Sequence, residues 1–396
     1  MGFRGDLLRP HTGGGAHRVT FIELFFDLVF VFAVTQVSHL LIRDESPLGV
    51  VHTLMLGAAI WWVWVDTAWV TNWLNPEKGA VRVMLVVLML LGLLMSSAIP
   101  EAFGDKALLF ALTFVTLQVA RSLFTVFAFA RRRPEHAGNF VRITIWLATS
   151  GVLWIAGALL PDAQLWLWLA AILLDYTGPR ARFFVPGMGR APLSSWDVSG
   201  AHMAERVSLF VIIALGESII VSGSTFSDLG VDGATVSAFL AAFASAVLMW
   251  LLYFSHSERR GSEYISEAAE RGLIAQVAYT YVPVPMVLGI VLTAVADHTV
   301  LVSPDVGSSW AVGLVCAGSA VYLVGIALFR RATGGPWLLS NLLGFAALVA
   351  LFFTHPVLSP VAVSWGSNLV LLAVVVADEL SLRRDGGVAT NPDSVL

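Results

Sequence analysis

The sequence predicts an all-α integral membrane protein of about twelve transmembrane helices in two repeated six-helix halves. Three observations support this prediction: an apolar composition, long apolar segments, and a one-sided distribution of basic residues. Hydrophobic residues make up 57% of the 396 residues and charged residues only 13%, against about 45–50% and about 25% in soluble domains. A water-soluble fold of this length could not bury so much apolar surface, so we expect the lipid bilayer to be its partner.

The apolar segments are long enough to cross a bilayer, which takes about 20 helical residues. The expected helices are residues 19–42, 49–74, 80–101, 107–130, 140–160, 164–178, 202–223, 233–256, 271–296, 309–330, 336–354 and 357–380. Pro283 and Pro285 lie in the ninth segment and lack amide donors, so that helix should be kinked or broken there. The first segment contains Glu23 and Asp27, and we expect it to be an uncleaved first spanning helix rather than a signal peptide.

The two halves of the chain resemble each other in the order of their motifs. The first helix begins ELFFDLVFV at residue 23, and the seventh contains ERVSLFVII from residue 205. Because six is an even number, both halves would insert the same way up, and sites in such proteins tend to lie between the repeats. The expected domains are a cytoplasmic N-terminal segment 1–18, a first half 19–182, a cytoplasmic connector 183–200, a second half 201–382 and a cytoplasmic tail 383–396.

Arginine and lysine fall almost entirely on one side of the predicted helices. With the N-terminus placed in the cytoplasm, the inside segments hold 19 of these residues and the outside segments hold only Arg43 and Lys106. Cytoplasmic loops are enriched in basic residues in multipass proteins. We therefore expect both termini to be cytoplasmic and the number of spanning helices to be even.

Several charged residues lie inside the predicted helices, where they are costly unless they face the bundle interior and are paired. Glu23 and Asp27 are four residues apart on the first helix and share one face. Arg206 enters the seventh helix from the same side of the membrane, and Asp66 and Arg121 lie in the cytoplasmic half of their helices. We therefore expect the first and seventh helices to be neighbours, with Arg206 close to Glu23 or Asp27.

Glu217 lies deeper in the seventh helix, next to Gly216, which permits another backbone to approach closely. The eleven residues from Arg206 to Glu217 return to nearly the same helix face, which His202 shares. The intramembrane acids exceed the intramembrane arginines by two. Two interpretations stay open, namely a salt-bridge network that fixes helix packing and a proton, cation or substrate path in which Glu217 is the leading residue. The candidate set is Glu23, Asp27, Asp66, Arg121, His202, Glu205, Arg206 and Glu217.

Other sequence features carry less functional information. The second helix contains Trp61, Trp62, Trp64, Trp69 and Trp73, and we interpret them as lipid-facing bulk with an interfacial belt, an aromatic pocket wall being the alternative. There is no HExxH, Walker or G-x-S-x-G motif, and the single cysteine cannot form an internal disulfide. We assign no catalytic residue, metal or cofactor, and a net charge of −4 gives no indication of nucleic-acid binding.

Two of these segments resemble a known family. The run ELFFDLVFV at residues 23–31 is similar to the opening motif of the bacterial low temperature requirement A family, and residues 202–218 resemble its second motif. Residues 71–74 and 98–103 are also similar to family segments, and the resemblance spans roughly residues 18–384. Val207 and Ser208 stand where the family more usually has an aromatic residue and a glycine. The resemblance implies a multipass protein of the bacterial inner membrane, linked by name to growth in the cold, with no settled activity.

Paired six-helix halves, intramembrane carboxylates and a proline-interrupted ninth helix favour a secondary transporter, and the carboxylates make protons a candidate coupling ion. The substrate, the coupling ion, the direction of transport and the oligomeric state are not readable from the sequence. The alternatives are an intramembrane enzyme or sensor that acts on a lipid or membrane-embedded ligand, and a structural stress-tolerance protein.

The predicted orientation is tested by reporter fusions at four predicted loops. Fusions at Gly104 and Gly307 should report an external location, and fusions at Pro134 and Gly334 a cytoplasmic one, because the basic residues lie on the side of the latter two. An alkaline-phosphatase and green-fluorescent-protein pair at each position measures the two locations. A reversed pattern would contradict the orientation.

Overall fold

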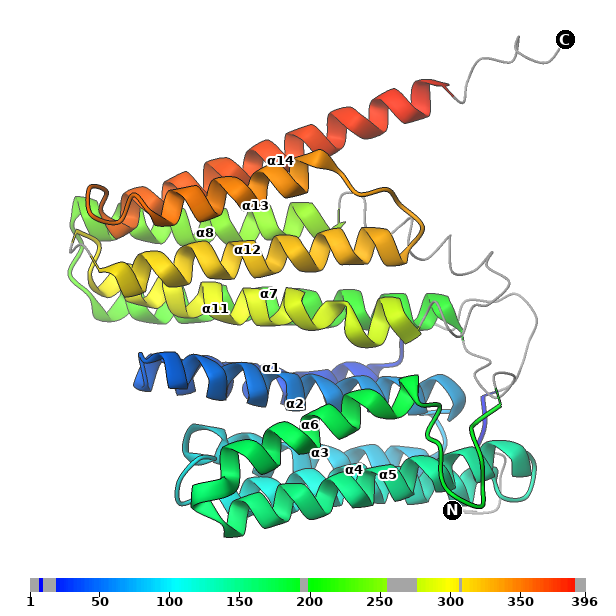
Figure 1. The fold of residues 1–396 in the computed structure, drawn as a ribbon. Coiled ribbons are helices and arrows are strands. Elements are labelled where there is room, and N and C mark those ends of the chain that lie inside the picture. The colour runs from blue at the N-terminus through cyan, green and yellow to red at the C-terminus, as the bar shows by residue number, and fades with distance from the viewer. Residues whose placement is uncertain (1–6, 10–18, 193–198, 255–275, 306–307, 389–396) are drawn as a thin grey trace, which may run out of the picture. The chain divides into compact units, whose positions relative to one another are not determined.

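The computed structural model describes residues 7–9, 19–192, 199–254, 276–305 and 308–388, with side chains up to residue 381 (Figure 1). In these residues the chain is helical, apart from isolated β-bridges that join Leu8 to Leu74 and Val185 to Gly189. The chain packs into two compact units. The first unit is Met1–Ile213 with Ser262–Tyr281, and the second is Ala214–Gly261 with Val282–Leu396.

The first unit contains six complete helices and the beginning of a seventh. They are α1 (Phe21–Arg43), α2 (Pro47–Trp73), α3 (Gly79–Ala98), α4 (Ala107–Phe129), α5 (Pro134–Leu159), α6 (Gln164–Arg180) and the first part of α7 (Gly200–Asp228). The start of α2 shows how local sequence sets a boundary: Ser46 accepts a 3.0 Å hydrogen bond from the Gly49 amide, and Pro47 occupies the first turn. Both are favoured at helix N-termini because amides there lack helical partners.

The second unit contains the remainder of α7 and five further helices in the described residues. They are α8 (Gly233–Phe254), α11 (Pro283–Val302), α12 (Ser309–Ala332), α13 (Leu339–Phe352) and α14 (Pro360–Val388). Ser308 caps α12 by accepting a hydrogen bond from the Ala311 amide at 3.3 Å. Helix α8 packs against α11 and α14, and α12 packs against α11, α13 and α14.

Ten helices in the described part of the chain are long and apolar enough to cross a membrane, which agrees with the predicted class. Every one of the twelve expected segments contains a helix, but α6 has 17 residues and α13 has 14. A helix rises 1.5 Å per residue, so α13 covers only about 21 Å of a hydrocarbon core roughly 30 Å thick. Twelve complete spans and the repeat of the halves remain predictions.

The ninth segment is interrupted close to the predicted prolines. A π-helical turn, Val277–Tyr281, precedes α11, which begins at Pro283 and ends at Val302 rather than at residue 296. Proline suits the first turn of a helix because no amide donor is needed there. The π-turn leaves the Thr280 carbonyl available to a side chain, and it accepts a 2.7 Å hydrogen bond from the Trp61 indole.

The tryptophans of α2 are buried in the first unit, so their interpretation as lipid-facing residues is wrong. Trp61, Trp62 and Trp64 are at most 2% exposed, and Trp69 and Trp73 are 6% exposed. An indole N–H in an apolar environment needs an acceptor. The Trp69 indole donates to the Thr280 hydroxyl at 2.9 Å, as the Trp61 indole does to the carbonyl of the same residue. Side-chain hydrogen bonds of this kind draw α2 into the interior of the unit.

Glycines bring α11 and α12 into close contact in the second unit. A Cβ atom on Gly289 would lie 2.6 Å from the Tyr322 backbone nitrogen and 2.9 Å from the Gly318 carbonyl oxygen. A Cβ atom on Gly318 would lie 2.8 Å from the Thr293 backbone nitrogen. Such approaches are typical of membrane helices that pack through small residues. The obstructing atoms are backbone, so the two helices would have to separate to accept a side chain.

This close contact predicts that Gly289→Ala destabilises the protein. Alanine normally stabilises a helix by about 1 kcal/mol relative to glycine, but forced overpacking costs about 1–3 kcal/mol. Thermal unfolding in detergent should show a lower Tm for Gly289→Ala. The matched control is Gly313→Ala, where the nearest atom is 3.6 Å away on the Phe352 side chain. An equal or higher Tm for Gly289→Ala would contradict the close contact.

Candidate functional site

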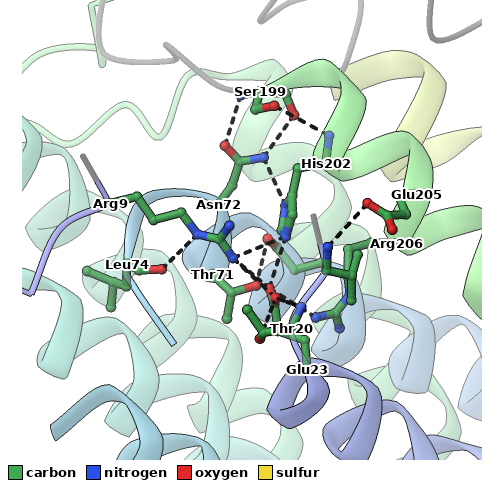
Figure 2. Close-up of polar contacts among 12 residues, drawn as sticks. Arg9, Thr20, Glu23, Thr71, Asn72, Leu74, Ser199, His202, Glu205 and Arg206 are labelled. Carbon is green, nitrogen blue, oxygen red and sulfur yellow. Dashed lines mark hydrogen bonds and ion pairs between the residues drawn. The ribbon is translucent and has the colours of Figure 1, made fainter. Parts of the chain in front are cut away.

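Several buried charged side chains of the first unit gather around Glu23 at the start of α1 (Figure 2). Its Oε2 accepts hydrogen bonds from the Thr20 amide at 2.9 Å and from the Thr20 hydroxyl at 2.8 Å. A glutamate in the third helical position commonly closes a helix N-terminus in this way. Its second oxygen, Oε1, is therefore left to meet groups from other segments. The Glu23 side chain is fully buried.

Arg9 reaches this carboxylate from the segment that precedes α1. The Arg9 amide donates to the Trp73 carbonyl at 2.8 Å and the Asn75 amide donates to the Leu7 carbonyl at 2.8 Å, so residues 7–9 lie antiparallel to the end of α2. Arg9 Nη2 lies 3.1 Å from Glu23 Oε1 and 3.2 Å from Oε2. Burial lowers the pKa of the Arg9 guanidinium, and the Glu23 carboxylate opposes this shift.

His202 at the start of α7 completes the surroundings of Glu23. Its Nε2 lies 3.0 Å from Glu23 Oε1, and its Nδ1 lies 3.4 Å from Asn72 Nδ2. Asn72 Oδ1 accepts from the Ser199 amide at 2.9 Å, which identifies Nδ2 as the donor toward the histidine. Arg9 Nη2 also lies 3.2 Å from His202 Nε2. The Ser199 backbone fixes the orientation of Asn72, and Asn72 in turn positions the His202 ring.

Arg206, one turn further along α7, joins both acids of α1. Its Nη2 lies 2.5 Å from Asp27 Oδ1 and its Nη1 lies 3.3 Å from Glu23 Oε1. The Trp64 indole donates to the same Asp27 oxygen at 2.7 Å, and the Arg206 guanidinium lies 5.5 Å from the Trp64 ring centroid. All three charged side chains are fully buried. The predicted proximity of Arg206 to Glu23 and Asp27 is confirmed.

These contacts define the α1–α7 charge cluster, which consists of Arg9, Glu23, Asp27, His202 and Arg206. Two arginines balance two carboxylates, so the cluster is electrically neutral when His202 is neutral. The sequence analysis counted two more acids than arginines over all the predicted helices; within this cluster the second arginine is Arg9, which lies ahead of α1. A buried network of this kind is costly to leave incomplete and restricts the packing of its helices.

Asp66 and Arg121 form a second pair, between α2 and α4. Arg121 Nη2 lies 3.0 Å from Asp66 Oδ2, and Nη1 donates to the Val63 carbonyl and to the Thr67 hydroxyl, each at 3.0 Å. Gln118 accepts a further hydrogen bond from Arg121 Nη2. Arg121 therefore uses both ends of its guanidinium to connect α4 to the backbone and side chains of α2. The side chain of Asp66 is 23% exposed, so part of the carboxylate remains accessible.

A small cavity in the first unit adjoins this pair. Its walls include Asp66, Arg121, Trp69, Trp73 and Gln276, and its volume is about 40 Å³. A water molecule needs roughly 10–15 Å³ by the same measure. The cavity thus has room for a few water molecules and is too small for an organic solute. Trp69 and Trp73 form part of this cavity's wall, whereas Trp61, Trp62 and Trp64 do not line it; the alternative interpretation of an aromatic pocket wall therefore applies to two of the five tryptophans.

The two remaining predicted residues lie outside the cluster. Glu205 is exposed on α7, and its Oε2 accepts a 3.2 Å hydrogen bond from the Val19 amide ahead of α1. Glu217 is fully buried but belongs to the second compact unit. In that unit the neighbouring residue Ser218 donates a 2.9 Å hydrogen bond to Asp297 Oδ2 on α11. Asp297 is 7% exposed.

Sequence reasoning missed four residues that complete these sites. Arg9 looked like an ordinary basic residue ahead of a span, and Asn72 carried no charge to identify it. Trp64 was treated with the other tryptophans, and Asp297 was not separated from the outer end of its helix. The available signals were an acid directly after the predicted ninth segment for Asp297 and the motif at residues 71–74 for Asn72. In the described part of the chain, no group of three or more His, Cys, Asp or Glu side chains is placed to hold a metal ion.

Comparison with known proteins agrees with the motifs on α1 and α7. Residues 18–376 match the family model described as bacterial low temperature requirement A protein (LtrA). The chain is also 38% identical over 391 residues to a protein of Rhizobium meliloti (strain 1021) named uncharacterized protein RA0937. That alignment covers 96% of this chain and 95% of the relative. The similarity therefore extends over both compact units.

The α1–α7 charge cluster predicts a large effect of Arg206→Gln on stability. Loss of the arginine leaves buried carboxylates uncompensated, which costs about 3–5 kcal/mol. Adding Asp27→Asn removes one of these charges, so the double variant should recover part of the loss. Thermal unfolding and the yield of monodisperse protein in detergent measure both effects.

The control for this experiment is Lys106→Gln. The variant removes an exposed ion pair between Lys106 and Glu101, in which the two side chains are 43% and 45% exposed. Such pairs contribute at most about 1 kcal/mol to the free energy of unfolding. If the double variant is no more stable than Arg206→Gln alone, charge compensation is not what Arg206 contributes.

Proposed function

The chain belongs to the bacterial low temperature requirement A (LtrA) family of multipass membrane proteins, and from this premise we propose that it is a proton-coupled secondary transporter of a small solute. The observation that carries the proposal is a buried acid whose hydrogen-bond donor is a neutral group. Asp297 lies inside a membrane helix, and its hydrogen-bond donor is the neutral Ser218 hydroxyl. An acid held by a neutral donor can lose and regain a proton without leaving an arginine uncompensated.

Buried acids of two kinds occur in the described residues. In the first unit Glu23 and Asp27 contact guanidinium groups, which favour the charged form of a carboxylate, whereas Asp175 accepts a 3.3 Å hydrogen bond from the neutral Trp154 indole. In the second unit Ser218 connects the Glu217 segment of α7 to Asp297 on α11. We propose that the α1–α7 charge cluster fixes helix packing, while Glu217 and Asp297 exchange protons. Glu217 is the leading residue because it is fully buried near the middle of α7.

The irregular segment before α11 is consistent with transport. Transporters often contain interrupted membrane helices whose free backbone groups line a substrate or ion site, and π-turns are frequent at functional sites. Here Val277–Tyr281 is π-helical and Pro283 begins the following helix. We further propose an inner-membrane location, cytoplasmic termini and twelve spans in two six-helix halves, supported by the distribution of basic residues.

A structural role is the second candidate function, and the charge balance of the first unit favours it. The α1–α7 charge cluster pairs each acid with an arginine, and the cavity of about 40 Å³ beside the Asp66–Arg121 pair has no room for a solute. The enzyme hypothesis has less support. A large groove on α12 and α13 opens beside Asn341, but its lining contains no acid and no nucleophile.

Uptake by cells tests the transport proposal. A strain that lacks the gene is complemented with the wild-type protein, Glu217→Gln, Asp297→Asn or Asp228→Asn, and solute uptake is profiled across pH values. Each amide variant keeps the side-chain shape but cannot carry a proton. We expect uptake by the first two variants to fall to the level of the deletion strain at unchanged protein abundance. Asp228 is an exposed acid at the end of α7, so its variant should transport normally.

Proteoliposomes then test the coupling itself. Addition of the identified solute to vesicles that contain wild-type protein and an internal pH dye should change the internal pH, and Glu217→Gln should abolish this change. Solute uptake without a pH change would retain transport but contradict proton coupling. Normal uptake by Glu217→Gln at normal abundance and at every pH would contradict the role of Glu217 as proton carrier.

A further inference from the structure

An apolar groove runs between α12 and α13 in the second unit. Its volume is about 570 Å³, within the range of roughly 300–1,000 Å³ found for small-molecule sites. Leu323 and Leu328 of α12 form one wall, and Leu342 and Phe345 of α13 form the other. The groove is too small for a packed helix, which is about 10–12 Å in diameter with its side chains. Its dimensions and lining suit a flexible hydrocarbon chain.

One polar side chain in the groove has no hydrogen-bond partner among the described residues. Asn341 is 6% exposed, and both Nδ2 and Oδ1 are buried and without a partner there. A buried polar group left without a hydrogen bond costs about 1–3 kcal/mol. The adjacent Ser340 does not have this deficit, because it donates to Asp378 at 2.7 Å, and Asp378 also pairs with Arg330 at 2.9 Å. The unsatisfied amide therefore indicates a ligand with a hydrogen-bonding group at this depth.

The polar end of the groove carries a cation and an interfacial aromatic residue. Arg331 is exposed at the end of α12, three residues after Leu328 and four after Ala327, which places it on the helix side that lines the groove. Trp337, which also lines the groove, is 62% exposed. Tryptophan and arginine are typical of the level at which lipid headgroups meet acyl chains. From this end inward, the groove presents a cation, an amide and then hydrocarbon.

We propose that the groove binds an anionic phospholipid of the leaflet that contacts the Arg331 end of α12. Arg331 binds the phosphate, Asn341 Nδ2 donates to a glycerol ester carbonyl, and one acyl chain lies between α12 and α13. The side-chain amide of asparagine rotates over a broad range, which lets Nδ2 turn toward the ester. This lipid site does not depend on whether the protein transports a solute.

Native mass spectrometry of the delipidated full-length protein tests the proposal. Dioleoyl phosphatidylglycerol and dioleoyl phosphatidylethanolamine are titrated separately, because they share acyl chains and differ in net charge. We expect tighter binding of phosphatidylglycerol by the wild-type protein, and about tenfold weaker binding by Asn341→Leu and by Arg331→Gln, equivalent to about 1.4 kcal/mol. Asn341→Gln retains an amide and should bind more tightly than Asn341→Leu. Soluble glycerol 3-phosphate should not displace the lipid.

Two further variants separate the lipid site from other causes. Leu342→Trp fills the groove without altering Asn341, so it should also weaken binding. Arg131→Gln removes an exposed arginine at the end of α4 and should leave binding unchanged. Equal affinity of the wild-type protein for the two lipids would overturn the proposal, as would unchanged binding in Asn341→Leu, Arg331→Gln and Leu342→Trp. Displacement of phosphatidylglycerol by glycerol 3-phosphate would also overturn the proposal. So would a dimer of the delipidated protein that dissociates in the Asn341→Leu variant, because the groove would then bind a second copy of the chain.

Discussion

The carboxylate of Glu23 joins three segments that are far apart in the sequence. One oxygen caps α1 through Thr20, while the other meets His202 and Arg206 of α7, and Arg9 contacts both. Because an unpaired charge is not tolerated in an apolar interior, these segments have to be in place together. Residues 7–9, the start of α1 and the start of α7 are therefore held together as one structural element. The antiparallel contact with the end of α2 adds a fourth segment to it.

Helix α2 connects this charge cluster to the rest of the first unit. Its Trp64 indole donates a hydrogen bond to Asp27. Its Val63 carbonyl and Thr67 hydroxyl accept hydrogen bonds from Arg121 of α4, and its Asp66 carboxylate pairs with the same arginine. Trp61 and Trp69 bury large apolar surfaces while their N–H groups donate to Thr280. A helix with this many polar attachments could not face lipid on all sides. The high tryptophan content of α2 thus reflects internal packing, not an interfacial belt.

In the second unit, close helix packing and neutral hydrogen-bond donors are prominent. Close glycine contacts hold α11 against α12, and the acid Asp297 receives its hydrogen bond from a hydroxyl. Asn341 has no partner at all in the described part of the chain. The α1–α7 charge cluster, by contrast, pairs each of its acids with an arginine. This difference underlies our proposal that the cluster fixes helix packing while groups of the second unit bind protons and lipid.

The sequence by itself determined the membrane class, the positions of the helices, the interruption near Pro283 and the pairing of Arg206 with the acids of α1. Each follows from local rules, because hydropathy reports burial in lipid and a charge inside a helix demands a counter-charge. Only the tertiary structure decided that Arg9 enters the cluster, that the α2 tryptophans are buried, that Asn72 orients His202, and that Asn341 lies in a groove. These depend on which side chains meet across separate segments. A hydrogen-bond donor such as Trp64 or Asn72 carries no net charge to identify its partner, so packing alone selects that partner.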